Sequence, residues 1–129
     1  MTGATLAKIP LFAGLSEHDR EQLAGVCSEI DVDAGSTLVS EDDFGYSMFA
    51  ILEGTADVIQ DGQTINTLRE GEAFGELAIL LGGRRQATVV ARTPMKLITL
   101  MNRDVWRLER EHPSVAESLR ETIARLLPT

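Results

Sequence analysis

Short β-type runs broken by turn residues fill the middle of the chain, and they constrain its fold more than any other feature. Glycines and acidic residues separate these runs at close intervals. Several short strands with turn signals between them are typical of an antiparallel sandwich or barrel. The runs are residues 37–40, 48–52, 55–60, 63–68, 86–91 and 96–101. The sequence therefore predicts a mainly β fold.

Turn chemistry supports this prediction. Asp61-Gly62 lies between two of the runs, and such a pair is a signal for a two-residue hairpin because glycine tolerates the positive φ of a type I′ turn. Gly54 and Gly71 are expected to mark other corners.

The first 28 residues have helical rather than β-type patterning. Residues 2–8 are a short helix candidate that Pro10 interrupts. Ser16 can cap a second helix over residues 17–27, with Asp19 three positions on. We expect helices before the β region.

Helical periodicity returns after residue 101. Asn102 can cap a helix over residues 103–111, in which Trp106 is expected in the core, and Pro113 suits the first position of another helix. The second helix carries an apolar stripe that can dock on the β region, form a dimer seam or cover a ligand: Val115, Leu119, Ile123 and Leu126.

Composition limits the classes of function. The length of 129 residues favours one domain over residues 1–129, and a net charge of −8 opposes binding to nucleic acid. The single cysteine, Cys27, excludes a disulfide framework, and no apolar segment is long enough to span a membrane. We therefore expect a cytoplasmic protein in a reducing compartment.

Catalytic and metal chemistry lack their usual residues. The only histidines, His18 and His112, fall in or beside predicted helices, so the ligand cluster of a metal-binding β barrel is missing. Acidic residues 41–43 are adjacent in sequence and lack the alternate spacing of a calcium loop. We expect neither an enzyme nor a metal site.

The stretch FGELAILLGGRRQATV, residues 74–89, carries the candidate site. Gly75 permits close approach of the backbone to a ligand, and residues 76–81 can form a helical turn with unpaired N–H groups. An ionised Glu76 accepts hydrogen bonds only, which suits a sugar hydroxyl, and Arg85 offers a fork of donors that suits phosphate. Together they indicate a site for a ribose joined to a phosphate.

This stretch resembles the phosphate-binding cassette of the cyclic nucleotide-binding domain family, which includes the cAMP receptor protein and protein kinase A regulatory subunits. The matching residues are Phe74-Gly75-Glu76-Leu77-Ala78 and Arg85-Gln86-Ala87-Thr88. Residues 9–16, 35–38 and 48–54 are similar to other parts of the family. The resemblance implies an antiparallel β roll of the double-stranded β-helix or jelly-roll type over residues 29–101, with helices over 1–28 and 102–129.

The resemblance also implies roles for individual residues. Glu76 would accept from the ribose 2′-hydroxyl, and Arg85 would pair with the cyclic phosphate. Backbone N–H groups would complete the cradle at Gly75, Leu77, Ala78, Gln86 and Ala87. Val58 and Ile65 would line the roll beside the base, with a lid from Leu119, Ile123 or Leu126.

Two departures from the family pattern bear on the ligand. Gln86 stands where many members carry Ser or Thr, the hydroxyl associated with guanine, so cAMP is favoured over cGMP. Tyr46 stands where many members carry an acid, and Arg84 is expected to be a solvated charge. We expect a regulatory module that moves its C-terminal helices when it binds a cyclic nucleotide and acts on an effector domain or protein partner. The alternative is a degenerate domain that serves as a protein-interaction module without ligand.

Overall fold

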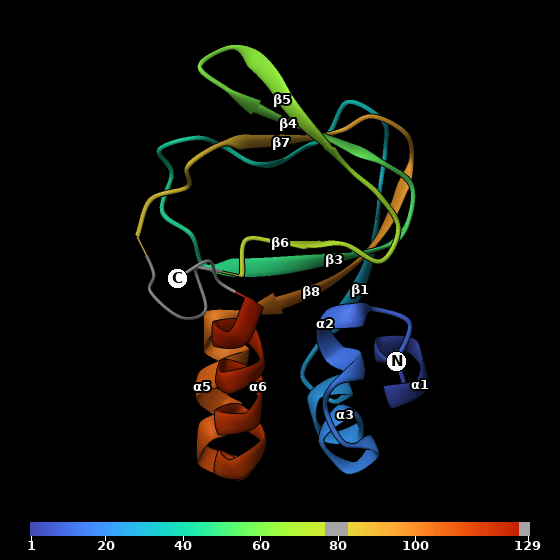
Figure 1. Cartoon of the computed structure of the whole chain (residues 1–129), viewed down its shortest axis with the longest axis vertical. Helices are drawn as coiled ribbons and strands as arrows, with labels where there is room; N and C mark the ends of the chain where they lie inside the picture. The colour runs from blue at the N-terminus through green and yellow to red at the C-terminus, as the bar shows by residue number, and fades with distance from the viewer. Residues whose placement is uncertain (77–82, 127–129) are drawn as a thin grey trace.

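Two antiparallel sheets form a roll with helices packed below one of them (Figure 1). The computed structural model describes residues 1–76 and 83–126. One sheet has the order β1-β8-β3-β6 and the other β2-β7-β4-β5. The first comprises β1 (Ser28–Val32), β8 (Met95–Met101), β3 (Ser47–Glu53) and β6 (Ala73–Phe74). The second comprises β2 (Thr37–Val39), β7 (Thr88–Ala91), β4 (Ala56–Gln60) and β5 (Gln63–Leu68). The predicted β roll is confirmed.

The strand β3 separates two apolar cores because successive side chains of a strand point to opposite faces. Met48 and Ala50 belong to the core shared with the helices, whereas Phe49 and Ile51 belong to the core inside the roll. The neighbouring strand β8 divides its side chains in the same way, with Leu97 inside the roll. Both faces of this sheet are therefore covered, which explains the continuous apolar run in β3.

The hairpin between β4 and β5 has the predicted turn. Asp61 and Gly62 both have positive φ, 51° and 79°, as a type I′ turn requires. The two strands that this turn joins pair in antiparallel register, beginning with Gln60 and Gln63, and the pairing is irregular between Val58 and Ile59. The tip of the hairpin lies at the far end of the roll from the helices (Figure 1).

Three short helices precede the roll: α1 (Gly3–Leu6), α2 (Pro10–Ala13) and α3 (Glu17–Ala24). The Ser16 hydroxyl accepts a hydrogen bond from the Asp19 N–H at 3.1 Å, which confirms the predicted cap. The helix predicted over residues 17–27 ends earlier, because Gly25 forms its C-cap. Pro10 begins a helix of its own, since proline suits the first helical position.

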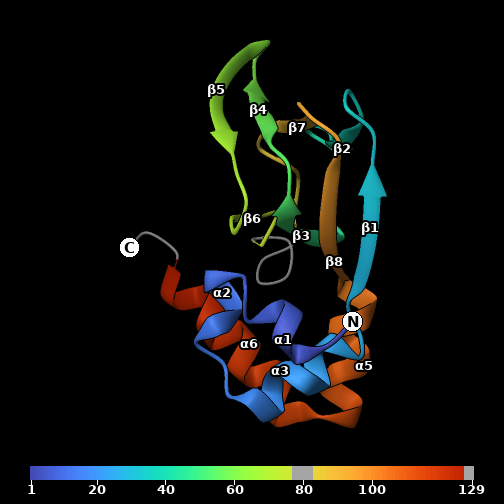
Figure 2. The ribbon, with the colours of Figure 1, turned by 90° about the vertical axis from the view of Figure 1, so that its right-hand side faces the viewer.

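Two helices follow the roll, α5 (Asn102–Glu111) and α6 (Pro113–Leu126). They run antiparallel to each other and lie beside the N-terminal helices (Figure 2). Asp104 caps α5 by accepting from the Met101 N–H at 3.0 Å, so the prediction that Asn102 is the cap was wrong. The prediction that Trp106 lies in the core was also wrong, because the buried side of α5 carries Val105 and Leu108 and leaves Trp106 57% exposed.

The longest helix in the described part of the chain is α6, with 14 residues. No helix among residues 1–76 and 83–126 is both long and apolar enough to cross a bilayer. Within the same ranges, no three His, Cys, Asp or Glu side chains gather into a group that could hold a metal ion.

Candidate functional site

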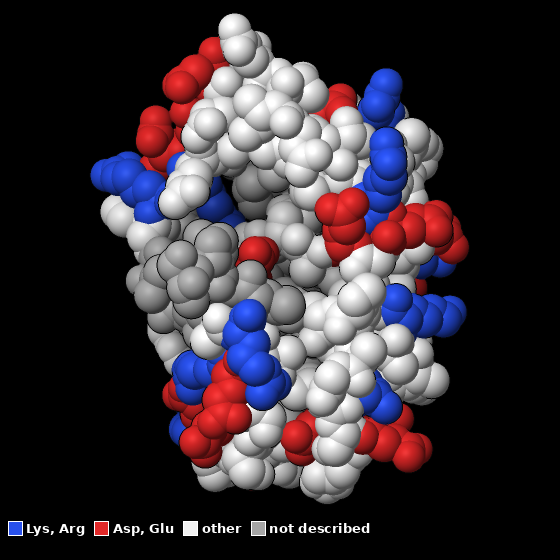
Figure 3. All heavy atoms as spheres, in the orientation of Figure 1, with Lys and Arg blue, Asp and Glu red and all other residues white. Residues whose placement is uncertain are grey.

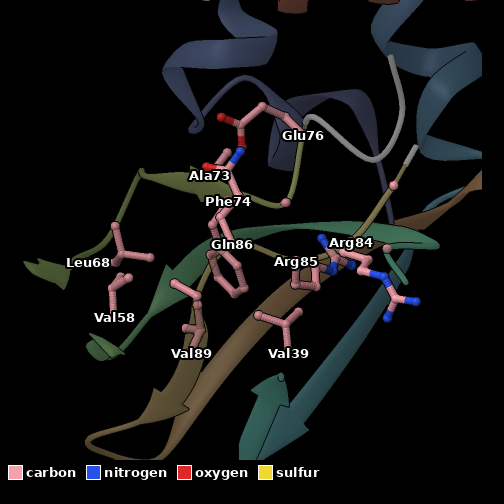
Figure 4. A pocket seen from close by; sticks show the side chains of 14 residues that line it. Val39, Val58, Leu68, Ala73, Phe74, Glu76, Arg84, Arg85, Gln86 and Val89 are labelled. Carbon is pink, nitrogen blue, oxygen red and sulfur yellow. The ribbon is translucent and has the colours of Figure 1, made fainter. Parts of the chain in front are cut away.

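A cavity of about 390 Å³ opens between the two sheets, a volume in the usual range for small-molecule sites. Figure 3 shows it as a hollow with basic and acidic atoms at its edge. Apolar side chains of both sheets gather on one side, and Glu76 lies at the opposite rim (Figure 4). The apolar lining includes Val39, Val58, Leu68, Phe74 and Val89. The cavity therefore combines an apolar wall with charged groups.

The backbone that carries Arg85 is fixed by a second loop. The Arg85 N–H donates to the Asp43 carbonyl at 2.6 Å, and the Arg85 carbonyl accepts from the Asp42 N–H at 2.9 Å. Two residues before Arg85, the Gly83 carbonyl accepts a hydrogen bond from the Gly45 N–H at 2.8 Å. Residues 83–85 thus pair with residues 42–45, so the loop that precedes β3 positions the arginine.

The Arg85 side chain is held at its guanidinium end. Its Nη2 donates to the Ser47 carbonyl at 2.6 Å and lies 3.5 Å from the Ser47 Oγ. Burial lowers the pKa of Arg85, and the Glu76 charge opposes this shift by raising it. An arginine has an ordinary pKa above 12 and stays protonated in proteins. The site thus has a fixed, half-buried positive charge.

Gly75 provides the space that the guanidinium occupies. Its φ is +76°, a conformation that side chains rarely adopt. A Cβ at this position would lie 2.5 Å from the Arg85 Nη1 and 2.9 Å from the Ser47 carbonyl oxygen. Glycine is therefore required here both by backbone conformation and by the close approach of Arg85.

Glu76 follows Gly75 and is half-buried at the rim of the cavity. The ion pairs of the described residues do not include Glu76 with Arg85. Both residues line the same cavity without forming an ion pair with each other (Figure 4).

Backbone donors add to the positive character of the cavity. Within residues 1–76 and 83–126, no oxygen accepts a hydrogen bond from the N–H of Gly75, Glu76, Gln86 or Ala87. All four residues line the cavity. Unpaired N–H groups beside an arginine form a cradle for an anion. Leu77 and Ala78, which the sequence also assigned to the cradle, lie outside the described residues.

The apolar wall differs from its prediction at one position. Val58 lines the cavity, but Ile65 is 56% exposed and does not. Val58 pairs with Asn66, and directly paired residues share a face, so the neighbouring Ile65 points to the other face. By the same alternation Leu68 shares the face of Asn66 and reaches the cavity, where the sequence analysis had missed it.

The apolar stripe of α6 is covered within the chain itself. Val115, Leu119 and Ile123 are almost completely buried in the core that the helices share with the first sheet. This favours docking among the three interpretations of the stripe. The side chain of Leu126 is not among those that the structure describes.

Polar contacts that the sequence analysis missed link the tip of the β4–β5 hairpin, Glu41 and residues 86–88. The Gln60 side-chain amide donates to the Gln86 carbonyl at 3.1 Å. The Glu41 N–H donates to the Thr88 hydroxyl at 2.9 Å, and the Glu41 carboxylate accepts from the Asp61 N–H at 3.2 Å. These contacts join segments far apart in sequence, so local motifs could not reveal them.

Known proteins are similar to this chain in both sequence and fold. Residues 29–112 match the family model of the cyclic nucleotide-binding domain. The cAMP-dependent protein kinase regulatory subunit of Eremothecium gossypii is 40% identical over 96 residues, and that of Yarrowia lipolytica is 33% identical over 97. The N-terminal domain of a Streptomyces coelicolor A3(2) transcriptional regulator, a solved structure, is 31% identical with a TM-score of 0.82.

The extent of these matches differs. The two kinase regulatory subunits align with 74% of this chain, which spans only 21% and 26% of their own length. The Streptomyces structure aligns with 94% of this chain and 88% of its own. A family model that covers most of the chain, together with these relatives, shows that the chain belongs to the cyclic nucleotide-binding domain family.

Proposed function

We propose that the protein binds cAMP in the cavity between the two sheets, as a regulatory module without catalytic activity. The observation that carries the proposal is one cavity with an apolar wall that holds Arg85, Glu76 and backbone N–H groups with no acceptor among residues 1–76 and 83–126. These groups match the cyclic phosphate, the ribose and the base of one ligand.

Each part of the ligand has a partner of suitable chemistry. The Arg85 guanidinium has five N–H donors, and those not used by Ser47 remain for the phosphate. The ionised Glu76 accepts from the ribose 2′-hydroxyl, and the N–H groups of Gly75, Gln86 and Ala87 donate to phosphate oxygens. The base lies against Val58, with which Leu68 and Val89 share the wall.

The preference for adenine over guanine rests on Gln86. Its side chain lines the cavity and lacks the hydroxyl that family members associate with guanine. The relatives named above as cAMP-dependent regulatory subunits support the same choice. The C-terminal helices α5 and α6 transmit binding to an effector or partner, because a ligand that binds one arrangement better shifts the protein toward it.

A thermal-shift titration with cAMP, cGMP and AMP tests the proposal. A ligand that binds only the folded state stabilises it by about 2.7 kcal/mol at a hundred times its Kd. We expect a shift with cAMP, a smaller one with cGMP and none with AMP, whose open phosphate has a different shape and charge. If millimolar cAMP causes no shift, the alternative of a protein-interaction module without ligand is supported instead.

A matched pair of variants assigns the site. Arg85→Ala should abolish the cAMP shift, whereas Arg92→Ala, which removes an exposed arginine outside the cavity, should retain it. Equal shifts in both variants would show that the ligand binds elsewhere.

A further inference from the structure

Large aromatic side chains are exposed on one side of the roll and on α5. The only tryptophan and the only tyrosine of the chain, Trp106 and Tyr46, are 57% and 62% exposed, and Phe44 is 54% exposed. A soluble domain usually buries much of such side chains, because each carries a large apolar area. Their exposure indicates a surface that a partner covers.

The exposed aromatics belong to elements that meet. The Tyr46 carbonyl accepts from the Asn102 N–H at 2.8 Å, which joins the start of β3 to the first turn of α5. The rings of Phe44 and Tyr46 are 6.5 Å apart, and Trp106 is one helical turn beyond Asn102. We name Phe44, Tyr46 and Trp106 the aromatic face.

Arginines flank this face. Arg103 and Arg110, both exposed, precede and follow Trp106 on α5 by about one helical turn each. They are therefore about 10 Å apart along the helix axis. The Arg84 guanidinium lies over the Phe44 ring, 4.6 Å from its centroid.

The acidic side chains of α5 are already engaged. Asp104 accepts from the Met101 N–H, Glu109 pairs with Arg120, and Glu111 pairs with Arg107 at 3.2 Å. Within residues 1–76 and 83–126, no carboxylate forms an ion pair with Arg103 or Arg110. These two arginines therefore give the helix an uncompensated positive charge beside Trp106, in a chain of net charge −8.

We propose that the aromatic face binds an acidic, apolar peptide segment of a partner protein. Trp and Arg are the residues that contribute most to protein interfaces when a partner covers them. Carboxylates about two helical turns apart on the partner would meet Arg103 and Arg110, with an aliphatic side chain against Trp106 between them. Arg85 and Glu76 are not part of this face, although Arg84 both lies over Phe44 and lines the nucleotide cavity.

A peptide suits this face better than a larger polyanion or a bilayer. A nucleic acid needs many phosphate contacts, and the net charge of −8 repels it outside this small region. An anionic membrane surface would meet the same repulsion. A short segment needs only a few contacts, which Arg103, Arg110 and Trp106 can supply.

The chain contains its own reporter for this test. Because Trp106 is the only tryptophan, its fluorescence monitors the aromatic face without a label. The probe is a synthetic 15-residue amphipathic peptide of Leu and Glu, and its control is the same peptide with every Glu replaced by Lys. Both are titrated into the full chain. We expect a saturable blue shift with the Glu peptide, weakened by salt, and at least about tenfold weaker binding of the Lys peptide. Similar affinities for the two peptides would overturn the proposal.

Charge reversal locates the binding surface. The double variant Arg103→Glu, Arg110→Glu should weaken binding of the Glu peptide at least about tenfold and improve binding of the Lys peptide. The control, Arg69→Glu with Arg92→Glu, changes exposed arginines elsewhere and should bind like the parent. Circular dichroism and urea unfolding check that each variant folds. Unchanged binding in the α5 variant would overturn the proposal, as would tighter binding of a single-stranded RNA or of phosphatidylserine vesicles than of the Glu peptide.

Discussion

Replacing Gly75 with alanine tests the close packing on which the cavity depends. The substitution has two effects that the structure separates. The first is the cost of placing a side chain at φ +76°, about 1–2 kcal/mol. The second is the overlap of the new Cβ with the Arg85 Nη1 at 2.5 Å and with the Ser47 carbonyl oxygen at 2.9 Å.

A second glycine isolates the first effect. Gly35 also has a positive φ, +88°, but a Cβ there would have no other atom within 4 Å. Gly35→Ala should therefore lower the free energy of unfolding by about 1–2 kcal/mol through backbone strain alone. Any additional loss in Gly75→Ala measures the steric overlap.

The overlap should affect both the fold and the site, because the Ser47 carbonyl belongs to the backbone and cannot easily move, whereas the end of the Arg85 side chain can move out of its position. Arg85 would lose its hydrogen bond to Ser47, a charge-assisted contact of about 1.5–3 kcal/mol. If half or more of that energy also orients the guanidinium for phosphate, cAMP affinity falls about three- to hundredfold.

Urea unfolding and titration calorimetry on the two variants give the required comparison. The expected pattern is a larger loss of stability in Gly75→Ala than in Gly35→Ala, because only Gly75→Ala overlaps the Ser47 carbonyl, and a loss of cAMP affinity in Gly75→Ala alone. Parent-like affinity in Gly75→Ala would refute the argument that Gly75 makes room for a phosphate-binding arginine. An equal loss of affinity in Gly35→Ala would trace the effect to general destabilisation.

The candidate site, the helical core and the single cysteine each allow further tests. Arg85→Ala should weaken cAMP binding about ten- to ten-thousand-fold by calorimetry, and Glu76→Gln should weaken it less, because an amide oxygen still accepts from a hydroxyl. Leu119→Ala should lower the free energy of unfolding by about 2–5 kcal/mol in urea, since its side chain is completely buried. Burial, with a smaller contribution from Asp104, raises the pKa of the Cys27 thiol to about 12, so Cys27 should resist iodoacetamide at pH 8 until the protein is unfolded. The same pKa shift favours the folded state fully below the unfolded thiol pKa of about 8.5, and this stabilisation is lost as the pH rises toward 12. Cys27→Ala should remove this contribution to the pH dependence of stability. Unfolding curves measured at alkaline pH would show the difference.

The fold was largely predictable because its signals are local. Asp61-Gly62 specifies a tight turn by its own backbone preferences, and the Ser16 cap needs only Asp19 three residues away. Such features depend on neighbours in the sequence. A pattern of short strands joined by them leaves few folds other than a roll or a sandwich.

Side-chain direction was harder to predict. Trp106 was expected in the core on its apolar character, yet the buried side of α5 is set by Val105 and Leu108. Ile65 was expected in the cavity, but Asn66 pairs with Val58 and takes the cavity face, so its neighbour Ile65 points to the other face. Which residues of β5 face the cavity depends on its pairing with β4, and the apolar character of Ile65 alone does not specify that register.

The candidate site combines both kinds of information. The cassette stretch indicates Glu76 and Arg85 without reference to the rest of the chain, because their charges and spacing fit a sugar phosphate. The Arg85 backbone, however, is held by Asp42 and Asp43, and its guanidinium by Ser47. These partners act through main-chain N–H and carbonyl groups, which every residue type possesses. The sequence could therefore name the charged residues of the site but not the loop that positions one of them, and that loop also carries Phe44 and Tyr46 to the surface.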